Sequence, residues 1–460
     1  MYREQDMEQI EQNLDKIKND AAKEYKTYYE PTLNEISKVY TAIKNYIKKN
    51  KKIVYGGFAQ NVLVAAKNPK DVFYTEIDGA YFNWPDIADI EFYSTSPLAD
   101  IINLTEELYA QGFKHVEGKE GMHAETYKIF VNFINYCDIS YMPVNIYNNM
   151  PTINIDGIIC THPHFMLVDS YRVLTDPLTS YWRIDKSINR FQKVLKYYPI
   201  ENTNMDQTII LQQNNKEIIN FIRKKIIHMS KLIVVGYYAF NYYAKKNSPK
   251  DIINIPYYEL ISIEFDKDAK HIYKHLLHKF GNKINVKEFS PFLSFLDKRI
   301  EFYYGNDLIL KLYGNNKRCI VYKYSDNKKT HFGTYNLVMM YLYFEYFYAF
   351  INHNKKQIDI FKKLIGKFFT LRNVYLTNKK LTVIDESPFQ DFTYKCYGTP
   401  VESIRASLLE GLEKRKQGKP MKFRYGATGK QGKIPDYNFS NSSGNQIFNE
   451  KNLIFKKNNI

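Results

Sequence analysis

The chain of 460 residues is long enough for two or three domains, and 44% of its residues are hydrophobic, so that each domain can bury a core. Its 65 Lys and Arg residues outnumber its 49 Asp and Glu residues, and the net charge of +16 favours nucleic acid over anionic membrane as a partner. No stretch approaches the roughly 20 uninterrupted apolar residues of a membrane span.

Cysteine usage and the N-terminal residues indicate the compartment. The N-terminus is charged where a signal peptide is apolar, and the four cysteines form no CxxC pair. This pattern argues against a disulfide framework and against a zinc site. We therefore expect a soluble intracellular protein with isolated buried thiols.

Two amphipathic helices are predicted within residues 1–50. Apolar residues recur at helical spacing from Met7 to Ile17 and again from Leu33 to Ile47. Pro31 lies between the two runs and separates the helices.

A strand, a tight turn and a helix are predicted in the sequence "KKIVYGGFAQNVLVAAKN", residues 51–68. Gly56 and Gly57 occupy the turn. Glycine permits a positive φ and a close approach by another group, and the first N–H groups of the following helix can bind an anion. The pattern suits a phosphate, although a plain strand-to-helix turn explains it as well.

The next segments alternate between strands and helices. Strands are predicted at 88–94, 125–133 and 134–144, and a helix at 97–110. Two further helices within 163–197 are broken around Asp176 and Pro177. The polar stretch 199–215 then indicates a boundary, so we expect one domain over 51–200 and another over 201–417.

The second domain repeats the pattern of the first. Residues 231–251 align with 51–71, and residues 261–276 align with 88–103, which indicates an internal duplication. In this alignment Gly57 faces Tyr237, Asp89 faces Ser262, Asp138 faces Ile309 or Leu310, and only Gly236 and Glu264 survive among the polar positions. The first copy is therefore the candidate active domain, and the second a degenerate copy.

Three carboxylates in the first copy form the candidate site. Asp89 and Glu91 alternate with Ile90 and Phe92, so both carboxylates project from one face of the strand while the apolar pair enters the core. Asp138 lies in a second strand and can supply a third carboxylate. Such a cluster suits Mg²⁺ bound together with substrate phosphates, whereas acidic residues on a solvent-facing strand are the alternative.

These motifs resemble the nucleotidyltransferase superfamily of the DNA polymerase β type. "VYGG", then "DIEF", then a strand aspartate follow its hG[GS]…Dh[DE]h…D pattern. Over residues 30–400 the chain more particularly resembles the poly(A) polymerase catalytic subunits of large DNA viruses. The resemblance implies an α+β fold with a catalytic nucleotidyltransferase domain, a degenerate second nucleotidyltransferase-like domain and N-terminal helices.

The resemblance also implies roles for the site residues. Gly56 and Gly57 would hold the triphosphate of ATP, while Asp89, Glu91 and Asp138 would hold two Mg²⁺ or Mn²⁺ ions. The activity implied is the addition of AMP to the 3′ end of single-stranded mRNA, in a virion or a cytoplasmic virus factory if the chain is viral. A homodimer or an accessory processivity subunit is a further expectation.

Two departures from the family pattern leave alternatives open. The stretch between Gly57 and Asp89 is longer than in the compact motif, so Asp78 and Asp86 are rival metal ligands. The second carboxylate is Glu91 rather than Asp. A noncatalytic RNA-binding protein, or a nucleotidyltransferase that makes another product, would also fit the scaffold.

A basic helical side and a basic tail complete the prediction. Arg183, Lys186 and Arg190 lie at i, i+3 and i+7, which suits phosphate contacts, although a solvated basic face is equally compatible. For Tyr181 and Trp182 we expect core packing rather than base stacking. Residues 418–460 are rich in Gly, Ser, Asn and Lys, and we expect a basic flexible tail.

Overall fold

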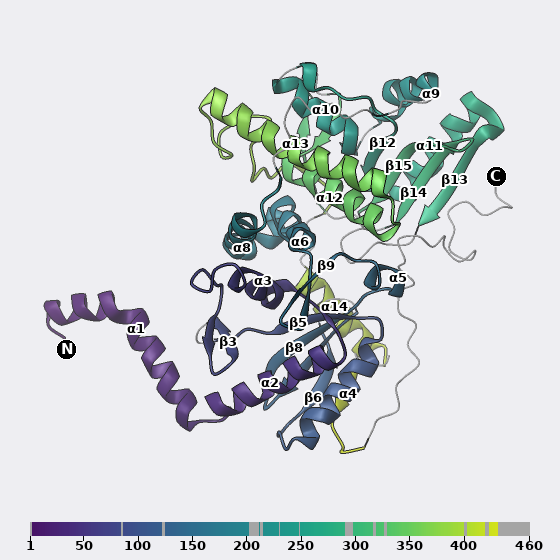
Figure 1. The fold of residues 1–460 in the computed structure, drawn as a ribbon. Helices are drawn as coiled ribbons and strands as arrows, with labels where there is room; N and C mark the ends of the chain where they lie inside the picture. The colour runs from purple at the N-terminus through teal and green to yellow at the C-terminus, as the bar shows by residue number, and fades with distance from the viewer. Residues whose placement is uncertain are drawn as a thin grey trace. The chain divides into compact units, whose positions relative to one another are not determined.

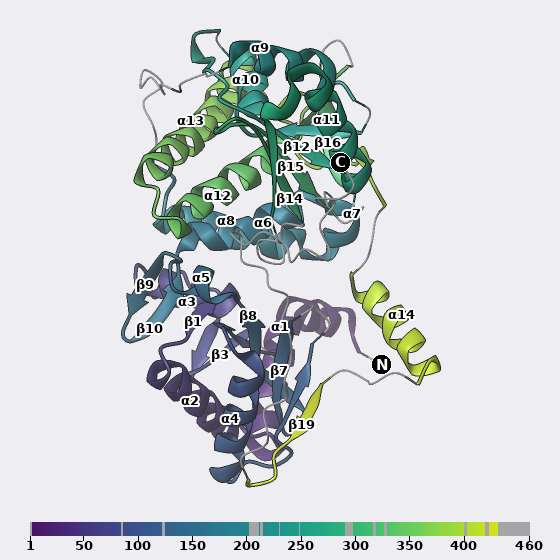
Figure 2. The same ribbon diagram turned by 90° about the vertical axis from the view of Figure 1, so that its right-hand side faces the viewer.

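The computed structural model describes most of the chain, namely residues 2–83, 86–121, 125–201, 211, 215–229, 231–247, 249–289, 298–315, 319–325, 329–399, 403–418 and 423–430. The described residues form an α+β protein, as expected from the sequence. They divide into two compact units, which are shown as ribbons in Figures 1 and 2.

The N-terminal part of the chain contains both predicted helices and the predicted strands. Its elements are α1 (Glu4–Tyr28), α2 (Leu33–Lys49), β1 (Ile53–Tyr55), α3 (Gly56–Ala65), β2 (Thr75–Ile77), β3 (Ala80–Asn83), β4 (Asp86–Ile87), β5 (Ile90–Ser94), α4 (Pro97–Ala110), β6 (Glu117–Glu120), β7 (Thr126–Val131), β8 (Ile134–Tyr141), α5 (Val144–Tyr147), β9 (Thr152–Ile155) and β10 (Ile158–Thr161). α2 begins after the N-cap Thr32, whose side chain accepts a hydrogen bond from the Glu35 N–H.

The first unit is built on one mixed sheet with the strand order β19-β6-β7-β8-β5-β1-β10-β9. β5 lies between β1, with which it is antiparallel, and β8, with which it is parallel. α2, α3 and α4 pack against this sheet, as Figure 1 shows. Ile90 and Phe92 are fully buried under these helices, as their alternation with Asp89 and Glu91 predicted.

A small additional sheet explains the long stretch between Gly57 and Asp89. β2, β3 and β4 form a separate three-stranded antiparallel sheet between α3 and β5. Asp78 lies in the turn between β2 and β3, and Asp86 lies in β4; both are exposed. The insertion therefore lengthens the motif without changing the order of β1, α3 and β5.

The remaining elements begin at residue 163. They are α6 (Pro163–Thr175), α7 (Pro177–Ser180), η1 (Tyr181–Arg183), α8 (Ile184–Tyr197), α9 (Lys216–Phe221), η2 (Ile222–Ile226), β11 (Leu232–Val235), α10 (Gly236–Asn247), η3 (Pro249–Asp251), β12 (Tyr258–Ser262), α11 (Phe265–Phe280), η4 (Gly281–Lys283), β13 (Ile284–Phe289), β14 (Arg299–Tyr304), β15 (Asp307–Gly314), β16 (Ile320–Tyr324), β17 (His331–Gly333), α12 (Tyr335–Ile351), α13 (Lys355–Lys379), β18 (Cys396–Tyr397), α14 (Ser403–Lys416) and β19 (Arg424–Gly426). Among the described residues, none of these helices or those before them is long and apolar enough to cross a membrane.

The second unit repeats the sheet of the first. Its strand order is β13-β14-β15-β12-β11-β17-β16-β18, so β12 lies between an antiparallel β11 and a parallel β15. The same directions hold for β5 between β1 and β8. The duplication expected from the sequence is therefore present in the topology of the two sheets.

The structure corrects the register of the expected alignment. Glu91 pairs with the residue before Gly56, and Glu259 pairs with the residue before Gly236, so Glu259 is the counterpart of Glu91. Glu264 instead precedes α11, where Ser96 precedes α4. The expected match of Glu264 to Glu91 was wrong because the alignment followed the letters "IEF" and not the strand pairing.

The contacts between described residues also group the chain differently from the expected domains. Within the described parts of the chain, the first unit takes the residues up to 142, 152–163 and those from 407 to 430, and the second takes 143–151 and those from 164 to 406. α7 and α8, and α6 apart from its first residue, therefore group with the second unit, whereas the sequence suggested that the first domain extends to residue 200.

Part of the expected flexible tail is ordered. β19 pairs with β6 at the edge of the first sheet, as the yellow strand in Figure 2 shows. Arg424 forms an ion pair with Glu117 at 2.6 Å, and Glu106 accepts hydrogen bonds from the N–H groups of Thr428 and Gly429, each at 2.9 Å. A flexible tail was therefore wrong for residues 423–430, because they complete a sheet edge. Lys419, Lys422 and Lys433 lie outside the described residues.

The cysteines also differ in part from the expectation. Cys137 and Cys160 are buried free thiols, as expected. Cys319 and Cys396 form a disulfide, with a Cα–Cα distance of 5.3 Å, beside the pairing of β16 with β18. Sequence spacing could not reveal this pair because the two residues are 77 positions apart and meet only in the folded sheet.

Candidate active site

Neighbouring strands bring the predicted carboxylates of the first unit together. Glu91 in β5 and Asp138 in β8 are directly paired positions of two parallel strands, so both side chains leave the same face of the sheet. Asp89 precedes β5 by one residue and raises the pKa of Asp138 through its charge. The predicted strands 88–94 and 134–144 therefore pair with each other, and the role of their carboxylates as one acidic site stays a prediction.

Glu91 lies against the N-terminus of α3. The N–H of Gly57 donates a hydrogen bond to Oε2 of Glu91 at 2.6 Å. Gly56 has a φ of +66°, and a Cβ at this position would lie 2.0 Å from the same oxygen. Gly56 is therefore required both for the backbone conformation and for the approach of Glu91, and a carboxylate occupies the donor that the sequence assigned to a phosphate.

Asp138 is held by two donors from its own unit. Lys128 in β7 donates from Nζ to both carboxylate oxygens, at 2.7 and 2.6 Å, and Asn135 donates to Oδ1 at 3.0 Å. Burial raises the pKa of Asp138 and Lys128 lowers it, and the net result is a pKa above the usual range. The sequence analysis missed Lys128, although its alternation along β7 places it on the face of Asp138.

Buried contacts behind the strand fix the position of β5. Asp100 near the start of α4 accepts hydrogen bonds from Tyr46 and from Lys52, each at 2.6 Å, and from the hydroxyl of Ser94. Tyr40 donates to the carbonyl of Ala88 at 2.7 Å, next to Asp89. These contacts attach α2 and α4 to both ends of β5 and so set the position of its carboxylates.

The donor set fits a divalent cation in its chemistry. Asp89, Glu91 and Asp138 offer carboxylate oxygens, which are the ligands that Mg²⁺ and Mn²⁺ prefer. Among the residues that the structure describes, however, no group of three His, Cys, Asp or Glu side chains is arranged to hold a metal ion. Two of the three carboxylates bind Gly57 and Lys128 instead, so metal binding stays a prediction.

The three basic residues predicted to lie along one side of a helix are divided between two helices. Arg183 ends the short helix η1, and Lys186 and Arg190 lie in α8. Lys186 is exposed, and Arg183 and Arg190 are half-buried. The two arginines lower the pKa of Asp169 in α6, after the larger effects of burial and Arg172. They group with the second unit, so their role toward ATP is untested.

The expectation for the two aromatic residues before this helix was wrong. Tyr181 is 72% exposed and Trp182 is 55% exposed. The guanidinium of Arg183 lies 5.4 Å from the ring of Trp182. The abundance of aromatic residues suggested core packing, but these two lie on η1, none of whose residues is buried.

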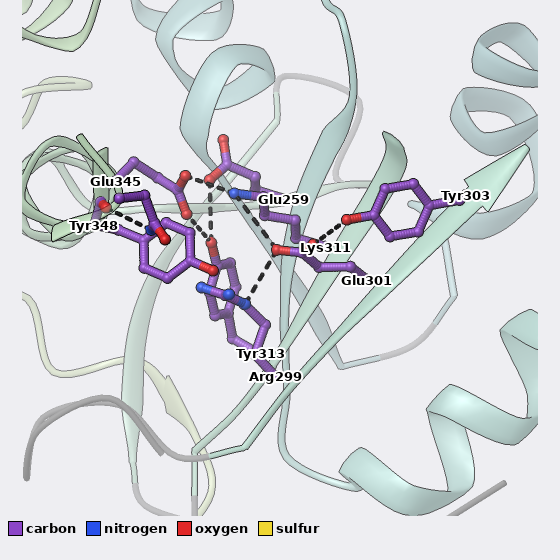
Figure 3. Close-up of polar contacts among 9 residues, drawn as sticks. Glu259, Arg299, Glu301, Tyr303, Lys311, Tyr313, Glu345 and Tyr348 are labelled. Atoms are coloured by element: carbon purple, nitrogen blue, oxygen red, sulfur yellow. Dashed lines mark hydrogen bonds and ion pairs between the residues drawn. The ribbon is translucent and has the colours of Figure 1, made fainter. Parts of the chain in front are cut away.

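The second unit carries a different set of residues at the corresponding strand positions (Figure 3). Glu259 in β12 pairs with Lys311 in β15, as Glu91 pairs with Asp138, and Lys311 pairs with Glu301 in β14, as Asp138 pairs with Lys128. Tyr257 precedes β12 by one residue, as Asp89 precedes β5.

A sequence signal for this register existed. Glu91, Ser94 and Asp100 recur with the same spacing as Glu259, Ser262 and Asp268. Ser262 donates a hydrogen bond to Asp268, as Ser94 does to Asp100. This spacing of a glutamate, a serine and an aspartate identifies the equivalent strands more reliably than the apolar letters.

Two family models match the chain. The model described as "Poly(A) polymerase catalytic subunit" covers residues 41–180, and the model described as "APMV, Putative poly(A) polymerase, catalytic subunit, C-terminal" covers residues 192–457.

Individual relatives extend this similarity over nearly the whole chain. The chain is 32% identical to the "Putative poly(A) polymerase catalytic subunit" of Acanthamoeba polyphaga mimivirus, over 98% of this chain and 84% of the relative. A protein of the same name from African swine fever virus (strain Badajoz 1971 Vero-adapted) is 27% identical over 36% of this chain and 34% of the relative. The fold is similar to the crystal structure of the Megavirus polyadenylate synthase, with a TM-score of 0.90 and 33% identity over 99% of this chain and 95% of that chain.

Proposed function

The chain belongs to the poly(A) polymerase catalytic subunit family, and we propose that its first unit adds AMP from ATP to the 3′ end of single-stranded RNA. The 3′ oxygen attacks the α-phosphorus of ATP, the bond to the β-phosphate breaks, and pyrophosphate leaves with loss of the hydroxyl proton. The observation that carries the proposal is the pairing of Glu91 with Asp138 beside the N-terminus of α3.

The three carboxylates have the role of cation ligands in this proposal. Asp89, Glu91 and Asp138 would hold two Mg²⁺ or Mn²⁺ ions, which would lower the pKa of the attacking hydroxyl and stabilise the leaving pyrophosphate. Lys128 favours the ionised form of Asp138, because its ammonium group lowers the pKa that burial raises.

The N-terminus of α3 has the role of the triphosphate site. Gly56 and Gly57 present the first N–H groups of the helix, which bind phosphate oxygens well. Glu91 uses the Gly57 N–H at 2.6 Å, so Glu91 and a phosphate compete for the same donor. We therefore expect Glu91 to leave Gly57 when ATP binds, which couples occupation of the phosphate site to reorientation of a cation ligand.

Basic and aromatic residues elsewhere would contact the two anionic substrates. Arg183, Lys186 and Arg190 are assigned to substrate phosphates, and the exposed rings of Tyr181 and Trp182 can stack on bases. The net charge of +16 supports binding of RNA, whose affinity should fall steeply with added salt. A second copy or an accessory subunit stays a prediction.

The direct experiment incubates the protein with end-labelled single-stranded RNA, Mg²⁺ or Mn²⁺, and each nucleoside triphosphate separately. We expect ATP to give a ladder of extended products and the other three triphosphates to give few or none. Tight RNA binding without extension by any triphosphate would indicate the noncatalytic alternative. Extension by all four triphosphates would contradict the assignment to adenylate addition.

A further inference from the structure

The second unit contains a buried cluster of charged side chains that the proposed function does not use. We call it the second-unit ion cluster, and it consists of Glu259, Arg299, Glu301, Lys311 and Glu345. Each of these side chains is at most 6% exposed. Figure 3 shows that four of them come from β12, β14 and β15, and that Glu345 reaches the group from α12. Burying so many charges costs free energy, and this cost must be offset by ion pairs and hydrogen bonds within the cluster.

Lys311 is the central cation of this cluster. Its Nζ donates to Oε2 of Glu345 at 2.6 Å and lies 3.9 Å from Oε1 of Glu301. Burial lowers the pKa of Lys311, but the charges of Glu345 and Glu301 more than offset this effect, and the pKa is raised. The ammonium group therefore stays charged inside the unit.

Lys311 is the cation that forms an ion pair with Glu345, whereas Arg299 forms one with Glu301. Arg299 forms an ion pair with Glu301 at 3.2 Å, and its guanidinium lies 4.3 Å from the ring of Tyr348. The hydroxyl of Tyr313 donates to Oε1 of Glu345 at 2.6 Å. The cluster contains two cations and three carboxyl groups, so one negative charge would be left unbalanced if all three carboxyl groups were ionised.

Protonation of Glu259 restores the charge balance. Burial and the neighbouring Glu345 raise the pKa of Glu259 to about 8. The hydroxyl of Tyr313 donates to Oε1 of Glu259 at 3.4 Å, and Oε2 lies so close to α10 that a Cβ at Gly236 would be 1.7 Å away. At neutral pH the cluster is therefore neutral overall, and Lys311 supplies half of its positive charge.

The position of Lys311 relates it to the first-unit site. By strand position, Lys311 corresponds to Asp138, Glu301 corresponds to Lys128, and Tyr257 corresponds to Asp89. Nζ of Lys311 lies 5.0 Å from the centroid of the Tyr257 ring. Two of the three positions that hold carboxylates in the first unit thus carry a cation and an aromatic ring that contact each other.

We propose that, in the second unit, the ammonium group of Lys311 takes the place of a divalent ion as the positive charge that the carboxylates bind. It neutralises the carboxylates that converge on this point and attaches α12 to the sheet through Glu345. The second unit then needs no metal ion for its folding and has no open position for one. This inference concerns the second unit alone, so it holds or fails separately from the activity of the first.

The test is cation rescue of the full-length variant Lys311→Ala. Removing the ammonium group leaves the carboxylates of Glu301 and Glu345 facing the space it filled. Loss of one partner of a buried ion pair should lower the melting temperature by about 10 °C in chelator-treated buffer. Added Mg²⁺, Mn²⁺ or ethylammonium should recover several degrees of this loss, whereas the wild type should shift much less under the same additions.

Two controls separate cation replacement from simple packing. In Lys311→Ala combined with Glu345→Gln the rescue should shrink, because the closest carboxylate is gone. Lys311→Arg, which keeps the charge, should lose less stability than Lys311→Ala. If Lys311→Ala is insoluble, the yield of soluble chain after refolding with and without Mn²⁺ gives the same comparison.

A Lys311→Ala variant as stable as the wild type would show that the charge is not needed. A large loss of stability without any response to divalent ions or ethylammonium would show that Lys311 acts through packing. The readout is stability, so a chain without adenylation activity could still show the rescue, and an active chain could fail to show it.

Discussion

In the first unit, aspartate on β8 faces lysine on β7, and in the second unit lysine on β15 faces glutamate on β14 at the same places of the same sheet. The two pairs, Asp138–Lys128 and Lys311–Glu301, carry the same charges in exchanged positions. In the second unit the exchange replaces the carboxylate at the position of Asp138, one of the three candidate cation ligands of the first unit. It adds a cation at that point in the second unit.

Burial distinguishes the two regions further. The side chains of Lys128 and Asp138 are 27% and 15% exposed, whereas those of Lys311 and Glu301 are 5% and 6% exposed. Water and ions can therefore reach the first pair, and the second is enclosed by α12 and aromatic rings. The comparison teaches that the same sheet positions can carry an accessible ion pair in one unit and a buried ion pair in the other.

The largest expected effect separates the two units by activity. Asp138→Asn should lower AMP addition by at least about 10³-fold, or about 4 kcal/mol of transition-state stabilisation, because it removes a cation ligand. In the second unit, Glu259→Gln, at the position that corresponds to Glu91, should leave the rate within about two-fold. Single-turnover addition of one AMP to labelled RNA measures both, and equal losses in the two variants would contradict the division of roles.

A smaller effect compares the stability of the two ion pairs. Glu345→Gln leaves Lys311 without its closest carboxylate, and we expect a loss of about 3–5 kcal/mol. Lys128→Met in the more accessible first-unit pair should cost only about 1 kcal/mol. Denaturant unfolding followed by circular dichroism measures the difference, and a greater loss for Lys128→Met would reverse the comparison.

The pH dependence of stability should also differ between the units. A folded pKa of about 8 at Glu259, against 4.5 for an ordinary glutamate, means that only the unfolded chain loses this proton between these values. Stability should therefore fall as pH rises from about 4.5 to 8, by about 3 kcal/mol at pH 7. Glu259→Gln should remove this part of the pH dependence.

Unfolding curves at pH 5 and pH 7.5 check this prediction. The variant should gain stability relative to the wild type at the higher pH. A constant difference between the two proteins at both values would show that Glu259 does not hold its proton in the folded chain.

The smallest expected effect concerns the edge of the first sheet. Glu106 accepts hydrogen bonds from the N–H groups of Thr428 and Gly429. Glu106→Ala should therefore release the segment around β19 and lower the free energy of unfolding by about 1 kcal/mol. Hydrogen exchange should accelerate in β6, which pairs with β19, and stay unchanged in β13 at the corresponding edge of the second sheet. Unchanged exchange in β6 would show that β19 does not depend on Glu106.

Local patterns were enough to predict much of the fold and the strands that carry Glu91 and Asp138. The alternation around Glu91, the glycines at the start of α3 and the helical runs separated by Pro31 are properties of neighbouring residues, and the strand and the helices were confirmed. The duplication was also visible, since an apolar framework is preserved when a sheet is copied.

Features that depend on pairing between distant strands could not be predicted in the same way. The partner of Asp138 is set by the register of β7 against β8, and the counterpart of Glu91 is set by the register of β11 against β12. The contact of β19 with β6 joins residues about three hundred positions apart. Sequence spacing carries no direct record of such contacts, so the ion cluster and the docked tail segment required the structure.

Binding of Mn²⁺ tests the central claim, that only the first unit takes a divalent ion, most directly. Free Mn²⁺ would be measured by electron paramagnetic resonance during titration of the wild type, of the combined variant Asp89→Asn and Asp138→Asn, and of Glu259→Gln. We predict that the wild type and Glu259→Gln bind Mn²⁺ alike and that the combined variant loses this binding. Mn²⁺ binding that survives in the combined variant but is lost in Glu259→Gln would contradict the account.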